Sequence, residues 1–527
     1  MKKRYLAAML CVSLAVSLFA GCTKEEKQVS KGAEVILNGE EIYPVSCEDT
    51  LTYLMGLNIF LQNSYENFIE TPLGQELEKN TGIKVEYIHP QNGQETEQIN
   101  ILMASNELPD MVSHQWSNYP GGPDRAINED VIYSLNEYID EYAPNYKKYL
   151  EENEDVAKKV KTDEGNHYIF PFIREETWMG AYKGIVVRND WLEKTGLSVP
   201  KTIDEFDKML YKFKGISKGE PLNIGKEVLM YAYGIGDEFY LDENGEVQYG
   251  PIQPEYKEVI TLMNKWYKEG ILNPDFAVMD GARRDSDILN DKAGVFYGAV
   301  GGAIGKYLGA KPSDNPDFDL IAIPQITKNG DEVPEFAYLE DRVNLNGGAA
   351  LSKNCKNIEL AIRYLDYGYS DQGYMLYNFG IEGISYNMVD GEPVLTDLLI
   401  NNPDGESIDT IAPRYLRASY SGQFVQDGRY VKQSLIYPQQ IAAYDTWGKS
   451  NMEKHIMPPV TLLPEELDKS SDIIVNVKTY VDEMFVKFVD GSKPIEDFDK
   501  YVEQLKAFGI DDLLKMKRSA VERFNKR

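Results

Sequence analysis

One cysteine near the start of the chain stands in a context that favours covalent lipid attachment. Residues 2–4 are basic, residues 5–20 carry no charge, and Ala20-Gly21 places small residues directly before Cys22. This order is that of an export signal, and a thiol at the cleavage point can receive a diacylglyceryl group. The apolar run is shorter than the ~20 residues of a membrane span, which disfavours a membrane helix. We predict a lipoprotein signal peptide over residues 1–21, lipidation of Cys22 and a lipid-anchored tether over residues 22–46.

The other reactive side chains form no recognised catalytic or metal-binding motif. Cys11 lies in the predicted signal, and Cys47 and Cys355 are too few for a disulfide framework in 527 residues, so we expect both to be unpaired. The four histidines show no metal-ligand spacing. His-Glu-x-x-His and Gly-x-x-x-x-Gly-Lys are absent from the sequence. We therefore expect no nucleophile elbow, no catalytic residue, no metal and no cofactor.

The acidic composition restricts the partners of the protein. The chain has 55 Lys and Arg against 85 Asp and Glu, a formal net charge of -30. This balance argues against nucleic acid and against flat binding to anionic lipid. It also disfavours a polyanionic ligand, unless arginines gather locally. The length is sufficient for two sizeable lobes.

Short apolar runs alternate with amphipathic segments, which is typical of an α/β protein. We predict a first strand over residues 51–61, a helix over 72–81 ended by Gly82, a strand over 83–88, a helix over 94–105 and a third strand from Asp110. A β-α-β-α-β opening implies a parallel sheet.

A second unit is predicted after Pro171. Its elements are a strand over 184–188, helices over 190–195 and after the Thr202 cap, a hairpin turn at 242–245, a helix over 254–269 and a strand over 292–299. Further helices are predicted over 358–369, 372–379, 471–489, 494–508 and 510–523.

Several blocks in series resemble one family. They are Thr81-Gly82-Ile83, ILMASNELPDM (101–111), VVRNDWLEKTGLSVPKTIDEF (186–206), DKAGVFYG (291–298), the block over residues 350–386, VDEMFVKFVDG (481–491) and DKYVEQLKAFGIDDLLK (499–515). In this order they are similar to the family 1 extracellular solute-binding proteins, in the large carbohydrate-type branch of Gram-positive lipoproteins. Some larger relatives carry a calcium loop in the second lobe, and the corresponding residues 216–222 lack one.

The resemblance implies a periplasmic-binding-protein-like fold of two α/β lobes, with a ligand cleft and hinge crossovers. The implied ranges are 47–172 and 322–380 for the first lobe, and 173–321 and 381–527 for the second. The implied function is delivery of a small solute, an oligosaccharide, to the permease subunits of an ABC importer. The protein would act as a monomer on the outer face of the cell membrane.

Sugars present flat ring faces and hydroxyl groups, so a site for them needs aromatic platforms with polar partners. Trp191 and Trp266 lie on predicted helices and are expected to pack in the core. The predicted ligand-binding residues lie at strand ends, near the crossover or in unpatterned segments: Trp116, Trp178, Tyr182, Glu382, Tyr386, Trp447, Asn63 and Arg417.

Two alternatives remain open at this point. A lipoprotein glycoside hydrolase would need two carboxylates across the scissile bond, and an acidic chain supplies many accidental pairs. A binding protein that serves a membrane sensor would need the same closed-lobe surface as one that serves a permease.

Overall fold

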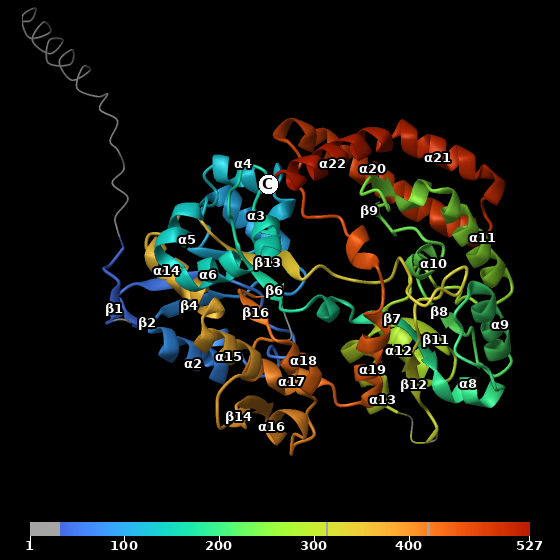
Figure 1. Ribbon diagram of the computed structural model, residues 1–527, viewed down its shortest axis with the longest axis horizontal. Coiled ribbons are helices and arrows are strands. Elements are labelled where there is room, and N and C mark those ends of the chain that lie inside the picture. The colour runs from blue at the N-terminus through green and yellow to red at the C-terminus, as the bar shows by residue number, and fades with distance from the viewer. Residues whose placement is uncertain (1–31, 40, 312, 314, 419–421) are drawn as a thin grey trace, which may run out of the picture.

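The computed structural model describes residues 32–527 except residues 40, 312, 314 and 419–421. The chain forms two lobes that lie side by side along the long axis of the molecule (Figure 1). The predicted signal peptide, Cys22 and the first part of the tether lie outside the described residues. In the part that is described, no helix is both long and apolar enough to cross a membrane.

The first lobe is built on a six-stranded sheet. In order across the sheet, its strands are β16 (Phe424–Gln426), β6 (Phe170–Arg174), β13 (Val343–Leu351), β5 (Met111–Ser113), β3 (Thr50–Leu54) and β4 (Lys84–Ile88). β13 is antiparallel to both of its neighbours, and the other pairs are parallel. Five strands therefore end at one edge, here named the carboxyl edge, where α/β proteins place their ligands.

The predicted β-α-β-α-β opening is confirmed: α2 (Pro72–Thr81) leads to β4, and α3 (Glu95–Ser105) leads to β5. The predicted first strand is too long, because β3 ends at Leu54. The Asn58 side chain accepts a hydrogen bond from the Phe60 amide at 2.9 Å and turns the chain. Leu57 and Leu61 are buried by this turn, so their apolar character does not reflect a strand.

Helices cover both faces of this sheet (Figure 1). The remaining helices and strands of this part of the chain are β1 (Ile36–Asn38), β2 (Glu41–Ser46), α4 (Gly122–Asn128), α5 (Asn136–Tyr142), α6 (Pro144–Glu152), α7 (Glu154–Lys159), α14 (Ile358–Asp366), α15 (Asp371–Phe379), β14 (Tyr386–Val389), β15 (Glu392–Leu395), α16 (Asp397–Ile400), α17 (Ile408–Ile411) and α18 (Gly428–Ser434).

The second lobe contains a four-stranded sheet in the order β12 (Leu320–Ala322), β7 (Lys183–Arg188), β11 (Val295–Ala299) and β8 (Leu222–Asn223). Its other elements are α8 (Asn189–Thr195), α9 (Ile203–Lys214), α10 (Lys226–Ala232), β9 (Phe239–Leu241), β10 (Val247–Tyr249), α11 (Pro254–Lys268), α12 (Gly281–Leu289), α13 (Lys306–Gly309), α19 (Pro438–Trp447), α20 (Pro464–Val489), α21 (Phe498–Ala507) and α22 (Ile510–Asn525). The predicted hairpin turn joins β9 to β10, and the predicted cap of α9 is present, with Thr202 Oγ1 accepting from the Glu205 amide at 3.1 Å.

The predicted helix over residues 471–489 begins too late, because α20 starts at Pro464. Pro464 occupies the first turn, where its missing N–H costs nothing. The Glu466 carboxylate accepts from the Leu463 amide at 3.0 Å and satisfies a donor at the helix entry. The sequence signal was therefore a proline followed by acidic residues, not an apolar pattern.

The lobe ranges expected from the sequence need revision. The boundary at residue 172 falls inside β6, and the boundary at 321 falls inside β12. β16 was assigned to the second lobe with residues 381–527, yet it pairs with β6. We propose that the first lobe includes residues 343–434. The chain would then pass from the first lobe to the second for the last time between α18 and α19. Strand order depends on contacts between distant segments, which local sequence patterns do not encode.

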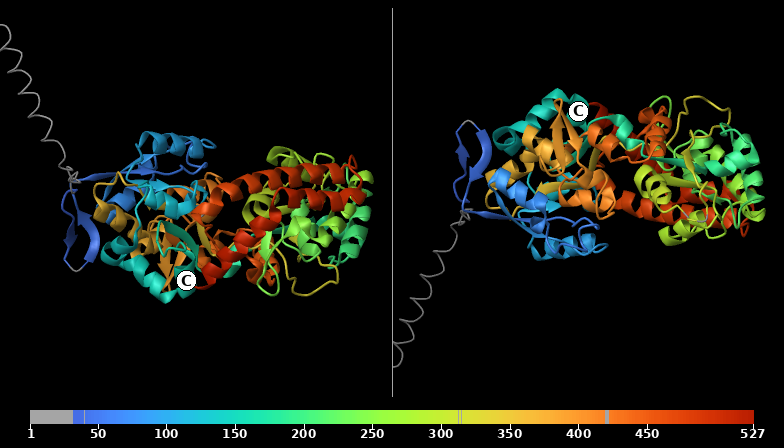
Figure 2. Two further views of the ribbon diagram at one scale, coloured as in Figure 1. Left: turned by 90° about the horizontal axis from the view of Figure 1, so that it is seen from above. Right: turned by 90° about the horizontal axis from the view of Figure 1, so that it is seen from below.

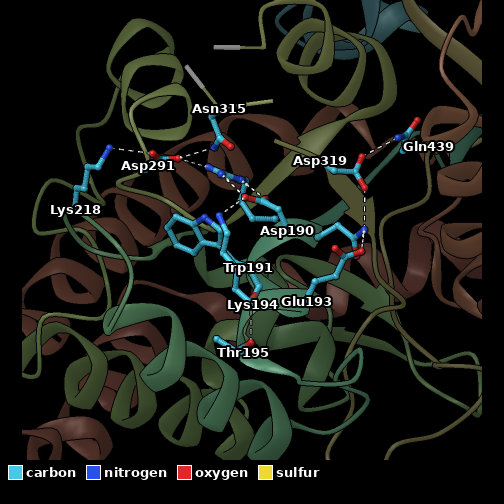
Figure 3. A network of polar contacts seen from close by, with 12 residues as sticks. Asp190, Trp191, Glu193, Lys194, Thr195, Lys218, Asp291, Asn315, Asp319 and Gln439 are labelled. Carbon is cyan, nitrogen blue, oxygen red and sulfur yellow. Dashed lines mark hydrogen bonds and ion pairs between the residues drawn. The ribbon is translucent and has the colours of Figure 1, made fainter. Parts of the chain in front are cut away.

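A buried ion-pair network lies where β7 of the second sheet leads into α8 (Figure 3). Arg188 is fully buried and donates to both carboxylate oxygens of Asp190 at 2.7 and 2.8 Å. It also donates to Asp291 at 2.9 Å. The Arg188 guanidinium lies 4.9 Å from the Trp191 ring and 4.3 Å from the Phe318 ring. Trp191 is 3% exposed, which confirms its expected packing role.

The end of the chain returns to the first lobe. Asp163, which follows α7, accepts from Arg523 at 2.7 Å and from Arg527 at 2.6 Å, and we name these three residues the C-terminal clamp. Figures 1 and 2 show α20–α22 running from the second lobe to the C-terminus beside the first. Burial would raise the pKa of Asp163, but the two arginines hold it below its ordinary value.

Both remaining cysteines are free, as expected. Cys355 is 1% exposed, and burial raises the pKa of its thiol well above the ordinary value. Cys47 is partly buried, and its thiol contacts the Ala33 carbonyl oxygen at 3.8 Å. Both thiols therefore belong to the packing of the first lobe.

Candidate ligand-binding site

One cavity lies between the lobes and has a volume of about 770 Å³. The first lobe contributes residues 117–123, which follow β5, and residues 343–346 at the start of β13. The second lobe contributes residues 459–462, the first turns of α20, and Lys517 on α22. A cavity with walls from both lobes changes shape when the lobes move, as ligand-driven closure requires.

Hydroxyl, amide and charged groups line this cavity. They include Asn118, Tyr119, Asn344, Asn346, Thr461, Ser470, Ser471, Lys161, Lys517, Glu340 and Asp341. Amide and hydroxyl side chains both donate and accept hydrogen bonds, so they match ligand hydroxyl groups of either orientation. The volume is within the range of sites for small ligands.

Two smaller cavities open along the carboxyl edge of the first sheet. One, of about 350 Å³, lies between α3 and the segment after β5, and is lined by Met103, Ser113 and His114 among others. Burial lowers the pKa of His114, which favours a neutral imidazole there. The other, of about 210 Å³, lies where β3 ends, between Met55–Asn58 on one side and Pro413, Leu416 and Arg417 on the other. The carboxyl edge is therefore concave at these two places.

A polar cluster joins the segments that cross between the lobes. Glu340 accepts from the hydroxyls of Tyr182 at 2.6 Å and Tyr338 at 2.8 Å, and from Arg174 at 2.7 Å. Burial would raise the pKa of Glu340, but these hydrogen bonds and the charge of Arg174 hold it below its ordinary value. The Lys183 ammonium lies 5.5 Å from the Tyr338 ring. The crossings thus present aromatic rings beside a fixed carboxylate.

Two predicted residues lie at this crossing. Tyr182 is half-buried and belongs to the cluster around Glu340. Trp178 is also half-buried, and its indole N–H donates to Glu176 at 2.6 Å. The Trp178 ring packs edge-on against Tyr444 at 5.1 Å. Neither residue is fully buried, and their predicted role in ligand binding stays a prediction.

Two other predicted platforms have buried rings. Trp116 is 0% exposed, and its indole N–H donates to the Val112 carbonyl at 3.2 Å. Trp447 is 4% exposed and donates to the Ile323 carbonyl at 3.1 Å. A side chain at Gly184 would overlap the Trp447 ring, with only 2.4 Å between them. In this conformation neither ring can stack on a ligand, because a short helical turn at Trp116 and the end of α19 at Trp447 direct the rings inward.

The last four predicted residues divide in the same way. Glu382 and Asn63 are exposed, Tyr386 is 6% exposed in the β14–β15 hairpin, and none of them lines any of the three cavities. Arg417 lines the cavity at the end of β3. Of the predicted set, Arg417 lines a cavity, and Trp178 and Tyr182 are half-buried at the crossing between the lobes.

Sequence reasoning missed Tyr338, Glu340, His114 and Lys517. Tyr338 and Glu340 stand in the segment Tyr-Leu-Glu-Asp-Arg directly before β13. An aromatic and acidic segment at the entry of a long strand is a signal that could have found them. Lys517 gave no such signal, because it lies on an amphipathic helix and reaches the cavity only through the packing of α22.

One segment has the spacing of a nucleophile elbow, contrary to expectation. Gly215-Ile216-Ser217-Lys218-Gly219 matches Gly-x-Ser-x-Gly. An elbow needs a strand before the serine and a helix after it, but here α9 precedes Ser217 and β8 follows it. The Ser217 hydroxyl donates to the Gly219 carbonyl at 2.9 Å.

Within the described residues, no three His, Cys, Asp or Glu side chains gather where they could hold a metal ion.

Comparison with known proteins assigns this architecture. The chain is 23% identical to lipoprotein LipO of Bacillus subtilis (strain 168), over 98% of both chains. It is 22% identical to the fructooligosaccharide ABC transporter substrate-binding protein FusA of Streptococcus pneumoniae, over 98% of this chain and 97% of the relative. The structure superposes on the alginate-binding protein AlgQ2, solved without calcium ion, with a TM-score of 0.71. The two are 24% identical, over 90% of this chain and 98% of that one.

These likenesses confirm the periplasmic-binding-protein-like fold that was expected from the sequence. Residues 63–375 match the model of bacterial extracellular solute-binding proteins. The matched range contains β4, β5, β6 and β13 of the first sheet and the whole second sheet. The chain therefore belongs to the family of bacterial extracellular solute-binding proteins.

Proposed function

We propose that this protein is a lipid-anchored receptor that captures an oligosaccharide outside the cell and delivers it to the permease of an ABC importer. The observation that carries the proposal is the 770 Å³ cavity with walls from both lobes, in a chain of this family. A binding protein must hold its ligand and release it, and a cavity divided between two lobes does both by opening and closing.

The chemistry of the cleft supports a sugar as the ligand. Tyr182 and Tyr338 lie at the crossing beside Glu340, which lines the larger cavity, and one Glu340 oxygen accepts from both of their hydroxyls. Amide and hydroxyl groups line the larger cavity. Flat apolar rings with polar partners at their rims suit the two kinds of surface of a sugar ring. The names of FusA and AlgQ2 point to saccharide ligands in two similar proteins.

The lipid anchor is a separate part of the proposal. It rests on the sequence before Cys22 and on the name of the relative LipO. Cells grown with labelled palmitate would label the wild type and leave Cys22→Ala unlabelled. Equal labelling of the two proteins would contradict the anchor and leave ligand binding untouched.

A ligand screen tests the capture step. Kestose, trigalacturonate and trimannuronate cover neutral and acidic oligosaccharides. A ligand at a hundred times its Kd would stabilise the folded state by about 2.7 kcal/mol, which a thermal shift measures readily. Scattering in solution should then give a smaller radius of gyration with the bound sugar. An unchanged radius at saturation would contradict lobe closure. Release of reducing sugar from a bound oligosaccharide would instead favour a glycoside hydrolase.

A further inference from the structure

Arg417 is a cation at the carboxyl edge that lacks an acidic partner. It lines the 210 Å³ cavity at the end of β3 and is half-buried. Its guanidinium donates to the Gln423 side-chain oxygen at 3.2 Å and contacts the Met55 sulfur at 3.3 Å. Among the residues that the structure describes, no Asp or Glu carboxylate lies within ion-pair distance of it. Arg414, three residues earlier, is paired with Glu406.

Aromatic rings surround this guanidinium but do not neutralise it. Its central carbon lies 5.5 Å from the Phe68 ring and 5.3 Å from the Tyr377 ring. Burial raises the pKa of Tyr377 to about 12, so its phenol stays protonated at physiological pH. Burial raises the pKa of Tyr53 as well. The positive charge therefore remains uncompensated inside the first lobe.

A charge that is partly removed from water without an opposite charge nearby is costly. Arg417 lies where an opposite charge could arrive from outside, because its cavity opens at the end of β3, a strand of the carboxyl edge. A hydrogen-bonded chain links this point to the neighbouring cavity: Gln423 approaches Ser113 at 3.5 Å, and Ser113 bonds to the Tyr53 hydroxyl at 2.6 Å. Ser113 lines the 350 Å³ cavity beside it. A ligand in the cleft would thus meet Arg417 on the first-lobe wall.

We propose that Arg417 binds a carboxylate of the ligand, so that the captured oligosaccharide contains an acidic sugar. This inference rests on the proposed function and narrows its substrate class. Guanidinium and carboxylate match in shape and form paired hydrogen bonds. The net charge of -30 disfavours a long polyanion, so the ligand is a short oligosaccharide with one carboxylate placed at Arg417.

Isothermal titration on the full mature protein tests this with trigalacturonate, its fully methyl-esterified form, trimannuronate and kestose. The methyl ester keeps the sugar rings and removes the charge. We expect an acidic trisaccharide to bind at least tenfold more tightly than kestose. If that trisaccharide is trigalacturonate, it should also bind at least tenfold more tightly than its methyl ester. Arg417→Gln should lose at least tenfold in affinity for the acidic sugar, and Arg417→Lys should lose less. Arg414→Gln is the matched control and should bind like the wild type.

The outcomes separate the two proposals. Tight binding of kestose alone, with Arg417→Gln unchanged, would overturn the acidic subsite and leave the oligosaccharide receptor standing. Equal binding of trigalacturonate and its methyl ester would also overturn it. Binding of none of the four sugars would contradict the oligosaccharide function, and the acidic subsite with it. Melting curves of each variant show whether the fold is intact.

Discussion

Arg188 and Arg417, one in each lobe, have similar aromatic neighbours but opposite electrostatic surroundings. Each guanidinium lies within 6 Å of two aromatic rings: Trp191 and Phe318 for one, Phe68 and Tyr377 for the other. Arg188 is also neutralised by Asp190 and Asp291, whereas no described carboxylate pairs with Arg417. A charge paired inside the protein supports the fold, and a charge left unpaired beside a cavity is available to a ligand.

The largest expected effect is the loss of Arg188. Arg188→Ala would leave Asp190, which is 3% exposed, without its bidentate partner. Breaking such a buried pair typically costs about 3–5 kcal/mol of stability. Chemical denaturation should show this loss, and the affinity of the remaining folded protein for a ligand should be unchanged. A stable Arg188→Ala protein would break the comparison between the two arginines.

Two tryptophans offer the same comparison between a buried side chain that supports the fold and a half-exposed side chain that a ligand could reach. Trp116→Ala should cost on the order of 3 kcal/mol, because it empties a fully buried site. Trp178→Ala should cost less than about 1 kcal/mol, because its ring is half-exposed. Thermal unfolding measures both variants. If Trp178 contacts the ligand, only its variant also weakens the binding of the folded protein.

His167 is a buried basic side chain that, unlike Arg188 and Arg417, stays neutral in the native state. It is 8% exposed, and burial lowers its pKa to about 4. The unfolded chain has a histidine pKa near 6.5, so below that pH the unfolded state takes up a proton that the native state refuses. The free energy of unfolding should therefore fall as the pH drops from about 6.5 to 4, by no more than about 3 kcal/mol.

His167→Gln would lack this titration, so its stability should change less over the same pH range. The measurement is a pair of denaturation series at matched pH values. Parallel curves for wild type and variant would show that His167 is protonated in the native state.

The smallest effect is expected for Arg417→Met, when its stability is measured without a ligand. Methionine keeps most of the apolar volume and removes an unpaired charge, so stability should stay within about 1 kcal/mol of the wild type or rise slightly. Melting temperatures without ligand measure this. A large loss of stability would give Arg417 the same structural role as Arg188.

Local patterns in the sequence predicted the secondary structure well where both ends of an element carry a signal. Gly82 ends α2 with a φ of 71°, and Thr202 caps α9 as its spacing with Glu205 indicates. The return of β16 to the first sheet was missed, because Phe424–Gln426 is only three residues long and its partner lies about 250 residues earlier.

The site was less predictable than the fold. Trp116 and Trp447 stand in unpatterned segments that are typical of loops, yet a short helical turn and the end of α19 direct their rings into the core. Whether a loop aromatic faces inward depends on the volume left by neighbouring elements, which a single sequence does not reveal. Arg417 was predicted because a polar, tyrosine-containing segment stands out by composition alone, and its role in ligand binding stays a prediction.

The C-terminal clamp affects how this protein is handled in the laboratory. Arg527 is 8% exposed in its side chain and is bound to Asp163 of the first lobe. A purification tag or fluorescent protein fused after Arg527 would therefore start at the joint between the lobes, not on a free surface. Such a fusion is a poor choice for affinity measurements. The same position is well suited to a biosensor, since a reporter there would be displaced when the lobes move.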